Sequence, residues 1–225
     1  MQSRLIHLGL LSAITAITIF FAISLKGEEY YMVSICLLAI ILLAFFMGFE
    51  KKIRMRDMLV IIVMSSIAVV SRIAFFFFPQ VKPLLAISII TGTALGPMAG
   101  FSTGAISVFL SNFYFGQGPY TPFQMVAAGL VGYLGGVFFY YHHKNRWLVT
   151  IYGILSAIIL YGFIVDLNTV FLTGRNLTWD FVLGIYAMAF PLNLIHGVST
   201  GGFLFFLYRP ILQRLERIQK KYGLD

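Results

Sequence analysis

Long apolar stretches separated by short polar segments dominate this sequence and limit the folds that the chain can adopt. Only 11% of the 225 residues are charged and 60% are hydrophobic, whereas about a quarter of the residues in soluble domains are charged. A helix needs about 20 mostly apolar residues to cross a bilayer. The composition excludes a soluble globular enzyme, a disordered chain and a disulfide-stapled secreted module, and it predicts an all-α polytopic membrane protein.

The apolar stretches predict eight transmembrane helices. The stretch 84–115 is too long for one of them and contains Leu95-Gly96-Pro97, where the proline interrupts helical hydrogen bonding, so we divide it in two. The predicted helices cover residues 5–25, 30–49, 58–78, 84–95, 97–115, 122–141, 147–167 and 181–208.

The charges predict how these helices are oriented. Eight helices place both termini on one side, and that side then carries most of the 16 lysines and arginines, as the positive-inside rule expects of the cytosol. The net charge of +8 therefore belongs to the cytosolic face and requires no nucleic-acid partner. The basic residues on that face are Arg4, Lys51, Lys52, Arg54, Arg56, Lys144, Arg146, Arg209, Arg214, Arg217, Lys220 and Lys221.

Glycine content divides the chain further, because the first two helices contain few glycines and the later ones contain many. We expect two N-terminal transmembrane helices in residues 1–50 and a basic cytosolic loop at 51–57. A six-helix core follows at 58–208, and a basic cytosolic tail at 209–225. Glycines four residues apart, from Gly92 to Gly104, let helices approach closely in lipid. This spacing favours packing within the bundle and leaves open a docking face for a second membrane subunit.

Polar side chains in or beside the spans are functional candidates, because they are costly in lipid. Arg72 either snorkels to the interface or points into an outward cavity as the partner of an anion or carbonyl. Asn112 and Gln124 flank an uncharged loop, 115–122, whose glycines, prolines and aromatic residues predict an ordered lid. Asn193 and His196 share a helix face, where hydrogen-bonded packing of the histidine is favoured over a ligand or proton-carrying role.

Several activities lack their sequence signatures. The chain has no GxxxxGK[ST] phosphate loop, no span with several acidic residues, and a single cysteine, Cys36, which excludes a cysteine-based metal cluster. Two alternatives stay open. One is a free-standing carrier or channel. The other is an intramembrane serine hydrolase, because Gly100-Phe-Ser-Thr-Gly104 and His196 weakly resemble the serine and histidine helices of rhomboid proteases.

Residues 68–138 carry a series of motifs that resemble a known family. They are Arg72-Ile-Ala-Phe75, Pro79-Gln-Val-Lys-Pro83, Leu95-Gly-Pro-Met-Ala-Gly100, Ser111-Asn-Phe113, Gly116-Gln-Gly-Pro-Tyr-Thr-Pro-Phe-Gln-Met125 and Gly129-Leu-Val-Gly132. Together they resemble the substrate-binding S components of energy-coupling-factor (ECF) transporters, particularly the branch associated with cobalamin. The two N-terminal helices would then be an addition to the six helices usual in that family.

The resemblance implies a bacterial plasma-membrane subunit that is not an enzyme and has no cofactor or metal of its own. It would capture cobalamin or a related corrinoid, or alternatively another vitamin, from outside under loops 79–83, 116–122 and 168–180. Its partners would be a transmembrane coupling subunit and two cytosolic ATPases that use ATP. The substrate-binding candidates are Arg72, Phe76, Lys82, Asn112, Tyr114, Gln117, Tyr120, Gln124, Asn168 and Trp179, and the candidates for docking the coupling subunit are Ser65, Ala68, Gly100 and Gly104.

Overall fold

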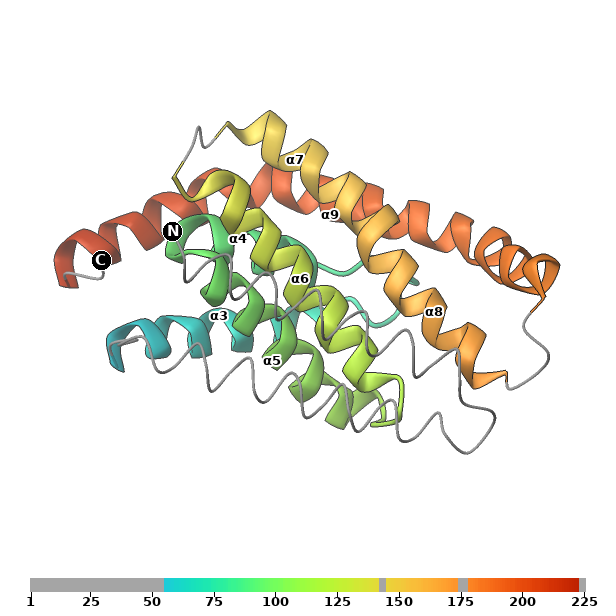
Figure 1. Cartoon of the computed structure of the whole chain (residues 1–225). Helices are drawn as coiled ribbons and strands as arrows, with labels where there is room; N and C mark the ends of the chain where they lie inside the picture. Colours follow the sequence, from blue (N-terminus) through green and yellow to red (C-terminus); the bar gives the residue numbers. More distant parts are fainter. Residues whose placement is uncertain (1–54, 142–144, 174–177, 223–225) are drawn as a thin grey trace, which may run out of the picture.

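The computed structural model describes residues 55–141, 145–173 and 178–222, which form a bundle of helices (Figure 1). The helices predicted at 5–25 and 30–49 lie outside the described residues. Helices α7 and α8 are joined by the π-helical turn η1 without a break. The elements, numbered as in Figure 1, are α3 (Met55–Ala74), α4 (Leu84–Leu95), α5 (Pro97–Phe115), α6 (Thr121–Phe139), α7 (Arg146–Leu155), η1 (Ser156–Tyr161), α8 (Gly162–Leu172) and α9 (Trp179–Tyr222).

The described helices are those of a polytopic membrane protein. Four helical segments are long and apolar enough to cross a bilayer, namely Asp57–Ala74, Thr121–Phe139, Arg146–Leu172 and Trp179–Tyr222. The helices predicted at 84–95 and 97–115 are confirmed with the same bounds. Helix α4 has 12 residues and is about 18 Å long at 1.5 Å per residue, which is less than the roughly 30 Å of a hydrocarbon core. The total of eight spans and the cytosolic termini stay predictions.

Three predicted helix ends are wrong by four residues or more. The helix predicted to end at residue 167 continues to Leu172. The helix predicted to reach residue 78 ends at Ala74, because Pro79 disfavours helical geometry in the residue before it and Gln80 has a φ of 59°. The helix predicted to end at residue 208 continues to Tyr222. The predicted tail is therefore mostly helical, since Leu212 and Leu215 pack into the core and hold this stretch against the bundle.

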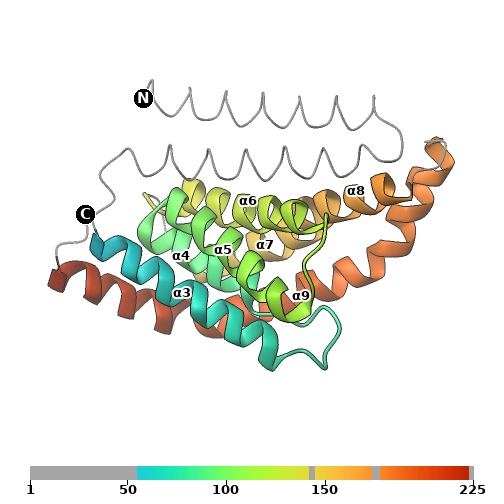
Figure 2. The same cartoon turned by 90° about the horizontal axis from the view of Figure 1, so that it is seen from below.

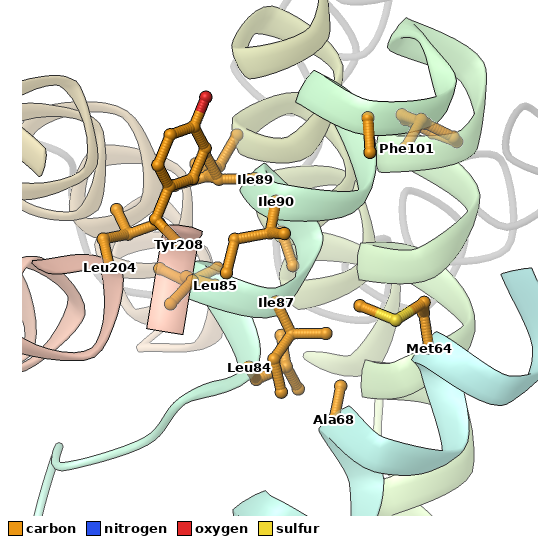
Figure 3. Close-up of a cluster of buried hydrophobic side chains, with 14 of the residues drawn as sticks. Met64, Ala68, Leu84, Leu85, Ile87, Ile89, Ile90, Phe101, Leu204 and Tyr208 are labelled. Atoms are coloured by element: carbon orange, nitrogen blue, oxygen red, sulfur yellow. The ribbon is translucent and has the colours of Figure 1, made fainter. Parts of the chain in front are cut away.

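Helix α4 lies at the centre of the bundle. It contacts α3, α5, α6, α7 and α9, and its residues from Leu84 to Ala94 are all buried. A helix that is apolar on every side is stable only when other helices surround it. Its hydroxyl groups are satisfied internally, as Ser88 and Thr91 each donate to a carbonyl one turn earlier at 2.9 Å. Figure 3 shows α4 side chains such as Leu85 and Ile90 among Met64, Leu204 and Tyr208 from α3 and α9.

The glycines of α4, α5 and α6 bring these three helices into close contact. A Cβ atom added at Gly92 or Gly100 would overlap the backbone of Gly132, and one added at Gly104 would overlap the backbone of Ala128. Packing within the bundle, which the sequence favoured, is thus observed at these positions. Gly96 has a different role, because its φ of 99° allows the chain to turn from α4 into α5 in a conformation that other residues rarely adopt.

The chain reversals gather at the two ends of the bundle. The C-terminal ends of α3, α5 and α8 lie at one end, whereas the α4–α5 turn, the end of α6, the start of α7 and the C-terminal part of α9 lie at the other (Figure 2). We call the first of these the loop end. The loops that the sequence predicted to face outward all begin there, so the fold brings their side chains to one side of the molecule.

Candidate functional site

Arg72 is the charged side chain at the centre of the loop end. It lies in the last turn of α3 and is only 8% exposed. Its Nη1 atom donates hydrogen bonds to Ser111 Oγ and, at 2.9 Å, to Asn112 Oδ1. Its Cζ atom lies 4.7 Å from the centre of the Phe115 ring, within the range of a cation–π contact. Arg72 therefore points into the bundle and does not snorkel to the interface.

Asn112 extends this contact into a hydrogen-bonded network. Its Nδ2 atom donates to Thr121 Oγ1 at 3.0 Å and to Gln124 Oε1 at 3.1 Å. Thr121 in turn donates from Oγ1 to Gln117 Oε1 at 3.0 Å. The network thus joins α3, α5, the loop after α5 and the first turn of α6. Because buried polar groups are costly unless they are bonded, it fixes the relative positions of these elements.

The loop after α5 is ordered by its own residues. Gly116 has a φ of 103°, which suits glycine, and its carbonyl accepts a hydrogen bond from the Tyr120 hydroxyl at 2.7 Å. Pro122 lies in the first turn of α6, where proline has no helical hydrogen bond to lose. Gln117 Nε2 donates to Phe109 O at 2.8 Å. The sequence prediction of an ordered loop agrees with these contacts.

Aromatic rings cover the network. The Phe76 ring lies 6.4 Å from Tyr114 and 5.7 Å from Phe115, and the latter two rings meet edge to face at 5.1 Å. Phe76 and Tyr114 are about half or more exposed, whereas Phe115 is partly buried. The rings form an apolar wall beside donors and acceptors from amides and hydroxyls, a combination typical of small-molecule sites.

Helices α8 and α9 contribute a second polar group. Asn193 Nδ2 donates to Asp166 Oδ2 at 2.7 Å, and the His196 ring meets the Tyr161 ring edge to face at 4.9 Å. Tyr161 is the last residue of η1, and a π-helical turn changes the direction of the side chains that follow it. Tyr161 lies near enough to Arg72 and to Asp166 for both charges to act on its hydroxyl group. The packing role favoured for His196 agrees with its burial.

Lys82 supplies a second positive charge. It lies in the segment between α3 and α4 and is partly buried. Burial, with the nearby charge of Arg72 as a second cause, lowers the pKa of Lys82 from 10.5 to about 8. Two cationic side chains of this chain are thus close enough at the loop end to repel each other.

The predicted binding residues separate into two sets. One set is brought together here: Arg72, Asn112, Gln117 and Gln124 by hydrogen bonds, Phe76 and Tyr114 by ring contacts, and Lys82 and Tyr120 by electrostatic interaction with Arg72. Asn168, predicted in a loop, lies instead within α8 and is buried. Trp179 is 83% exposed at the start of α9, and among the described residues no hydrogen bond of this network reaches it.

Sequence reasoning missed three side chains that hold the network together. Ser111, Phe115 and Thr121 all fall within or beside the motifs quoted above, but none was singled out. Their signal is positional: Ser111 precedes Asn112, and Thr121 precedes the proline that begins α6. Hydroxyl residues at such places commonly complete local hydrogen-bond networks.

The residues predicted to dock a coupling subunit lie inside the bundle. Ser65 and Ala68 of α3 are 1% and 0% exposed, and Ser65 O accepts a hydrogen bond from Ser107 at 3.4 Å. Gly100 and Gly104 face the backbone of α6. Their small size serves helix packing, and this arrangement leaves them no surface for a second protein.

Comparison with known proteins gives one match. The family model for the ECF-type riboflavin transporter, S component, matches residues 52–212, which is more than two thirds of the chain and includes the whole network described above. No curated protein and no solved structure matches the chain at a significant level.

Proposed function

We propose, on the premise that this chain belongs to the family of ECF-type riboflavin transporter S components, that it captures a flavin, with riboflavin as the leading candidate. As an S component it is a membrane-embedded substrate-binding subunit of an ECF importer and a transporter subunit, not an enzyme. S components work with a transmembrane coupling component and ATPases. The flavin, the bacterial plasma membrane and the outward orientation of the loop end are parts of the proposal.

The observation that carries the proposal is the amide and hydroxyl network beneath an aromatic wall. A flavin has a flat tricyclic ring with one edge of alternating carbonyl and N–H groups. Gln124, which is partly buried and is held by a hydrogen bond from Asn112, offers an amide group, and Phe76 and Phe115 offer ring faces. Aromatic rings pack on one another at a gain of about 0.5–1.5 kcal/mol beyond area burial. Polar groups fix the ligand's orientation, while the rings supply most of the contact area.

Cobalamin is the second candidate, and the motifs between Arg72 and Gly132 favour it. The same amides suit it, because a corrin ring is bordered by carboxamide groups. The name of the matching family favours riboflavin and does not support the cobalamin assignment. The two ligands are therefore compared directly in the first experiment.

The experiment uses the full chain, purified in detergent without partners or ATP. Riboflavin binding is followed by quenching of flavin fluorescence, and cobalamin binding by isothermal titration calorimetry. We expect saturable riboflavin binding with one ligand per chain. Binding of cobalamin with no response to riboflavin would overturn the flavin proposal and leave the S-component class intact.

Substitution of Asn112 by alanine tests whether the network binds the ligand. The side chain is 1% exposed and makes three hydrogen bonds, and a buried partner left unbonded costs about 1–3 kcal/mol. We expect riboflavin affinity to fall by about tenfold or more. Gln213→Ala, an exposed amide on the C-terminal part of α9, is the matched control and leaves affinity unchanged. Equal affinities in the two variants would remove Asn112 from the site.

A further inference from the structure

The loop end contains two positive charges that the described residues do not neutralise. Arg72 is buried and Lys82 partly buried, and their charges interact. Within residues 55–141, 145–173 and 178–222, neither forms an ion pair with a carboxylate. A buried charge is strongly unfavourable without a charged or well hydrogen-bonded partner, and two like charges side by side increase that cost.

Arg72 is held in place by only part of its guanidinium group. Nη1 makes both hydrogen bonds, to Ser111 and Asn112, and Phe115 covers the planar face. Within the described residues, the hydrogen bonds of Arg72 come from Nη1, and none comes from Nε or Nη2. These two N–H groups form the edge that binds a carboxylate or phosphate with two parallel hydrogen bonds.

The nearest buried carboxylate is already engaged. Asp166 on α8 accepts a hydrogen bond from Asn193, and its electrostatic neighbours include Tyr161 and Tyr186. Among the described residues, no hydrogen bond or ion pair joins Asp166 to Arg72. The guanidinium is fixed in orientation by Nη1 and has one edge with no hydrogen bond to a described residue. Such an edge matches the geometry with which proteins recognise planar acids and phosphates.

We propose that Arg72 and Lys82 together bind an acidic group, a phosphate or a carboxylate, of the transported ligand. The inference rests on the proposed function, that a flavin is bound, and changes its leading candidate. Riboflavin has no acidic group, so among flavins the site favours a phosphorylated one such as riboflavin 5′-phosphate. Among corrinoids, the same reasoning favours cobalamin, which contains a phosphodiester, over cobinamide, which lacks it. Arg72 supplies the paired hydrogen bonds, and Lys82 adds a point charge from the adjoining segment.

The test compares ligands with and without the acidic group. Riboflavin and riboflavin 5′-phosphate differ in that group alone, whereas cobalamin also has a ribose and a benzimidazole base that cobinamide lacks. The full chain in detergent is titrated with riboflavin and riboflavin 5′-phosphate, and separately with cobinamide and cobalamin, at constant ionic strength. Inorganic phosphate serves as a small acidic probe: the thermal midpoint of unfolding is measured in phosphate and compared with that in chloride. Whichever class of ligand binds, flavin or corrinoid, we expect its phosphate-containing member to bind at least tenfold more tightly than the member without phosphate.

For each variant we measure one ratio, the affinity for the acidic ligand divided by the affinity for the ligand that lacks the acidic group. Arg72→Gln and Lys82→Gln are each expected to reduce this ratio by about tenfold. Arg214→Gln and Lys220→Gln, which remove exposed charges on α9, are the matched controls and leave the ratio unchanged. Because Arg72 also holds Ser111 and Asn112, Arg72→Gln is compared with Arg72→Lys, which keeps the charge but loses the paired geometry. Lys82 lies outside the helices, so Lys82→Gln tests the proposal without disturbing the hydrogen bonds of Arg72.

The outcomes separate this inference from the proposed function. Preference for cobalamin over cobinamide without flavin binding would overturn the flavin proposal and support the acidic-group inference. Equal affinity for riboflavin and its phosphate would overturn the inference and support the flavin proposal. An acidic-group preference that survives in both Arg72→Gln and Lys82→Gln would overturn it as well. The inference would also be overturned if no acidic probe, including inorganic phosphate, bound or stabilised the chain.

Discussion

A single side chain, Asn112, joins three helices at the loop end through its bonds to Arg72, Thr121 and Gln124. Its carbonyl accepts from a cation while its amide nitrogen donates twice, so every strong hydrogen-bonding direction toward the bundle is used. An aspartate here would lose both donated bonds, and a leucine would lose all three. The network is specific at the level of individual atoms, and the ligand-binding effect expected of Asn112→Ala follows from that specificity.

The proposed role of Lys82 predicts that acidic-ligand binding depends on pH. Its pKa is lowered to about 8 by burial and by the charge of Arg72, so the ammonium group is protonated below pH 8 and loses its proton as the pH rises through that value. The ratio of riboflavin 5′-phosphate affinity to riboflavin affinity should fall between about pH 7.5 and 9.5. Titrations in this window avoid the second ionisation of the phosphate, near pH 6.

Riboflavin and riboflavin 5′-phosphate contain the same flavin ring, so ionisation of that ring cancels in the ratio of their affinities. Arg72 keeps its charge throughout this range, and Tyr120 and Tyr161 lie near it. In Lys82→Gln the affinity ratio should therefore be nearly flat with pH. A wild-type ratio that rises with pH would contradict the assignment of the positive charge to Lys82.

Different sequence properties place α4, the pair α5 and α6, and α9 in the bundle. Helix α4 is central because it is apolar all round, and α5 and α6 pack closely because glycines line their contact. Helix α9 has 44 residues, or about 66 Å at 1.5 Å per residue, and contains Pro191 and Pro210. Its C-terminal part is held against the bundle, where Gln219 Nε2 donates to Ala94 O at 2.8 Å.

Gly104→Ala tests the close contact of α5 and α6. The added Cβ would overlap the backbone of Ala128 and Gly129, and because backbone cannot move aside as a side chain does, the two helices must separate. We expect a loss of stability of about 1–3 kcal/mol, the usual cost of overpacking, seen as a fall of several degrees in the thermal midpoint in detergent.

Gly202→Ala is the control for this substitution. It lies on α9, and a Cβ atom there meets nothing within 4 Å. Alanine is a better helix former than glycine by roughly 0.5–1 kcal/mol, so the midpoint should stay the same or rise slightly. Equal losses in Gly104→Ala and Gly202→Ala would show that the α5–α6 contact tolerates extra volume.

At the scale of the whole molecule, the two ends of the bundle differ in chemistry. The loop end carries the aromatic wall and the polar network, whereas the opposite end holds the C-terminal part of α9 (Figure 2). That part of α9 carries exposed basic residues such as Arg214, Arg217 and Lys220. Basic residues concentrate on the cytosolic side of membrane proteins. The arrangement thus supports the proposal that the loop end faces outward.

Cysteine labelling tests this orientation. The chain contains one cysteine, Cys36, so Cys36→Ser gives a background without thiols. Into it we place either Gln117→Cys at the loop end or Arg217→Cys on α9, both at exposed positions. A membrane-impermeant maleimide added to intact cells should label the first and not the second, and permeabilisation should expose the second. The reverse pattern would show that the loop end faces the cytosol.

The sequence by itself determined the class of the protein and most of its helices. Apolar length is a local property, so α4 and α5 were predicted with the correct bounds, and the resemblance of the motifs around Arg72 and Asn112 identified the S-component family that the family model then showed. The same local reasoning failed at the end of α9, because whether a helix continues past its apolar stretch depends on what Leu212 and Leu215 pack against.

Only the tertiary structure decided what each polar and small residue does. Arg72 could snorkel or point inward, and the choice depended on partners about 40 positions away. Gly100 and Gly104 could pack or dock, and the choice depended on the position of α6. The physical reason is the same in both cases: the local sequence fixes the cost of a buried charge or the freedom of a glycine, but the partner that meets it comes from a distant part of the chain and is set by the fold.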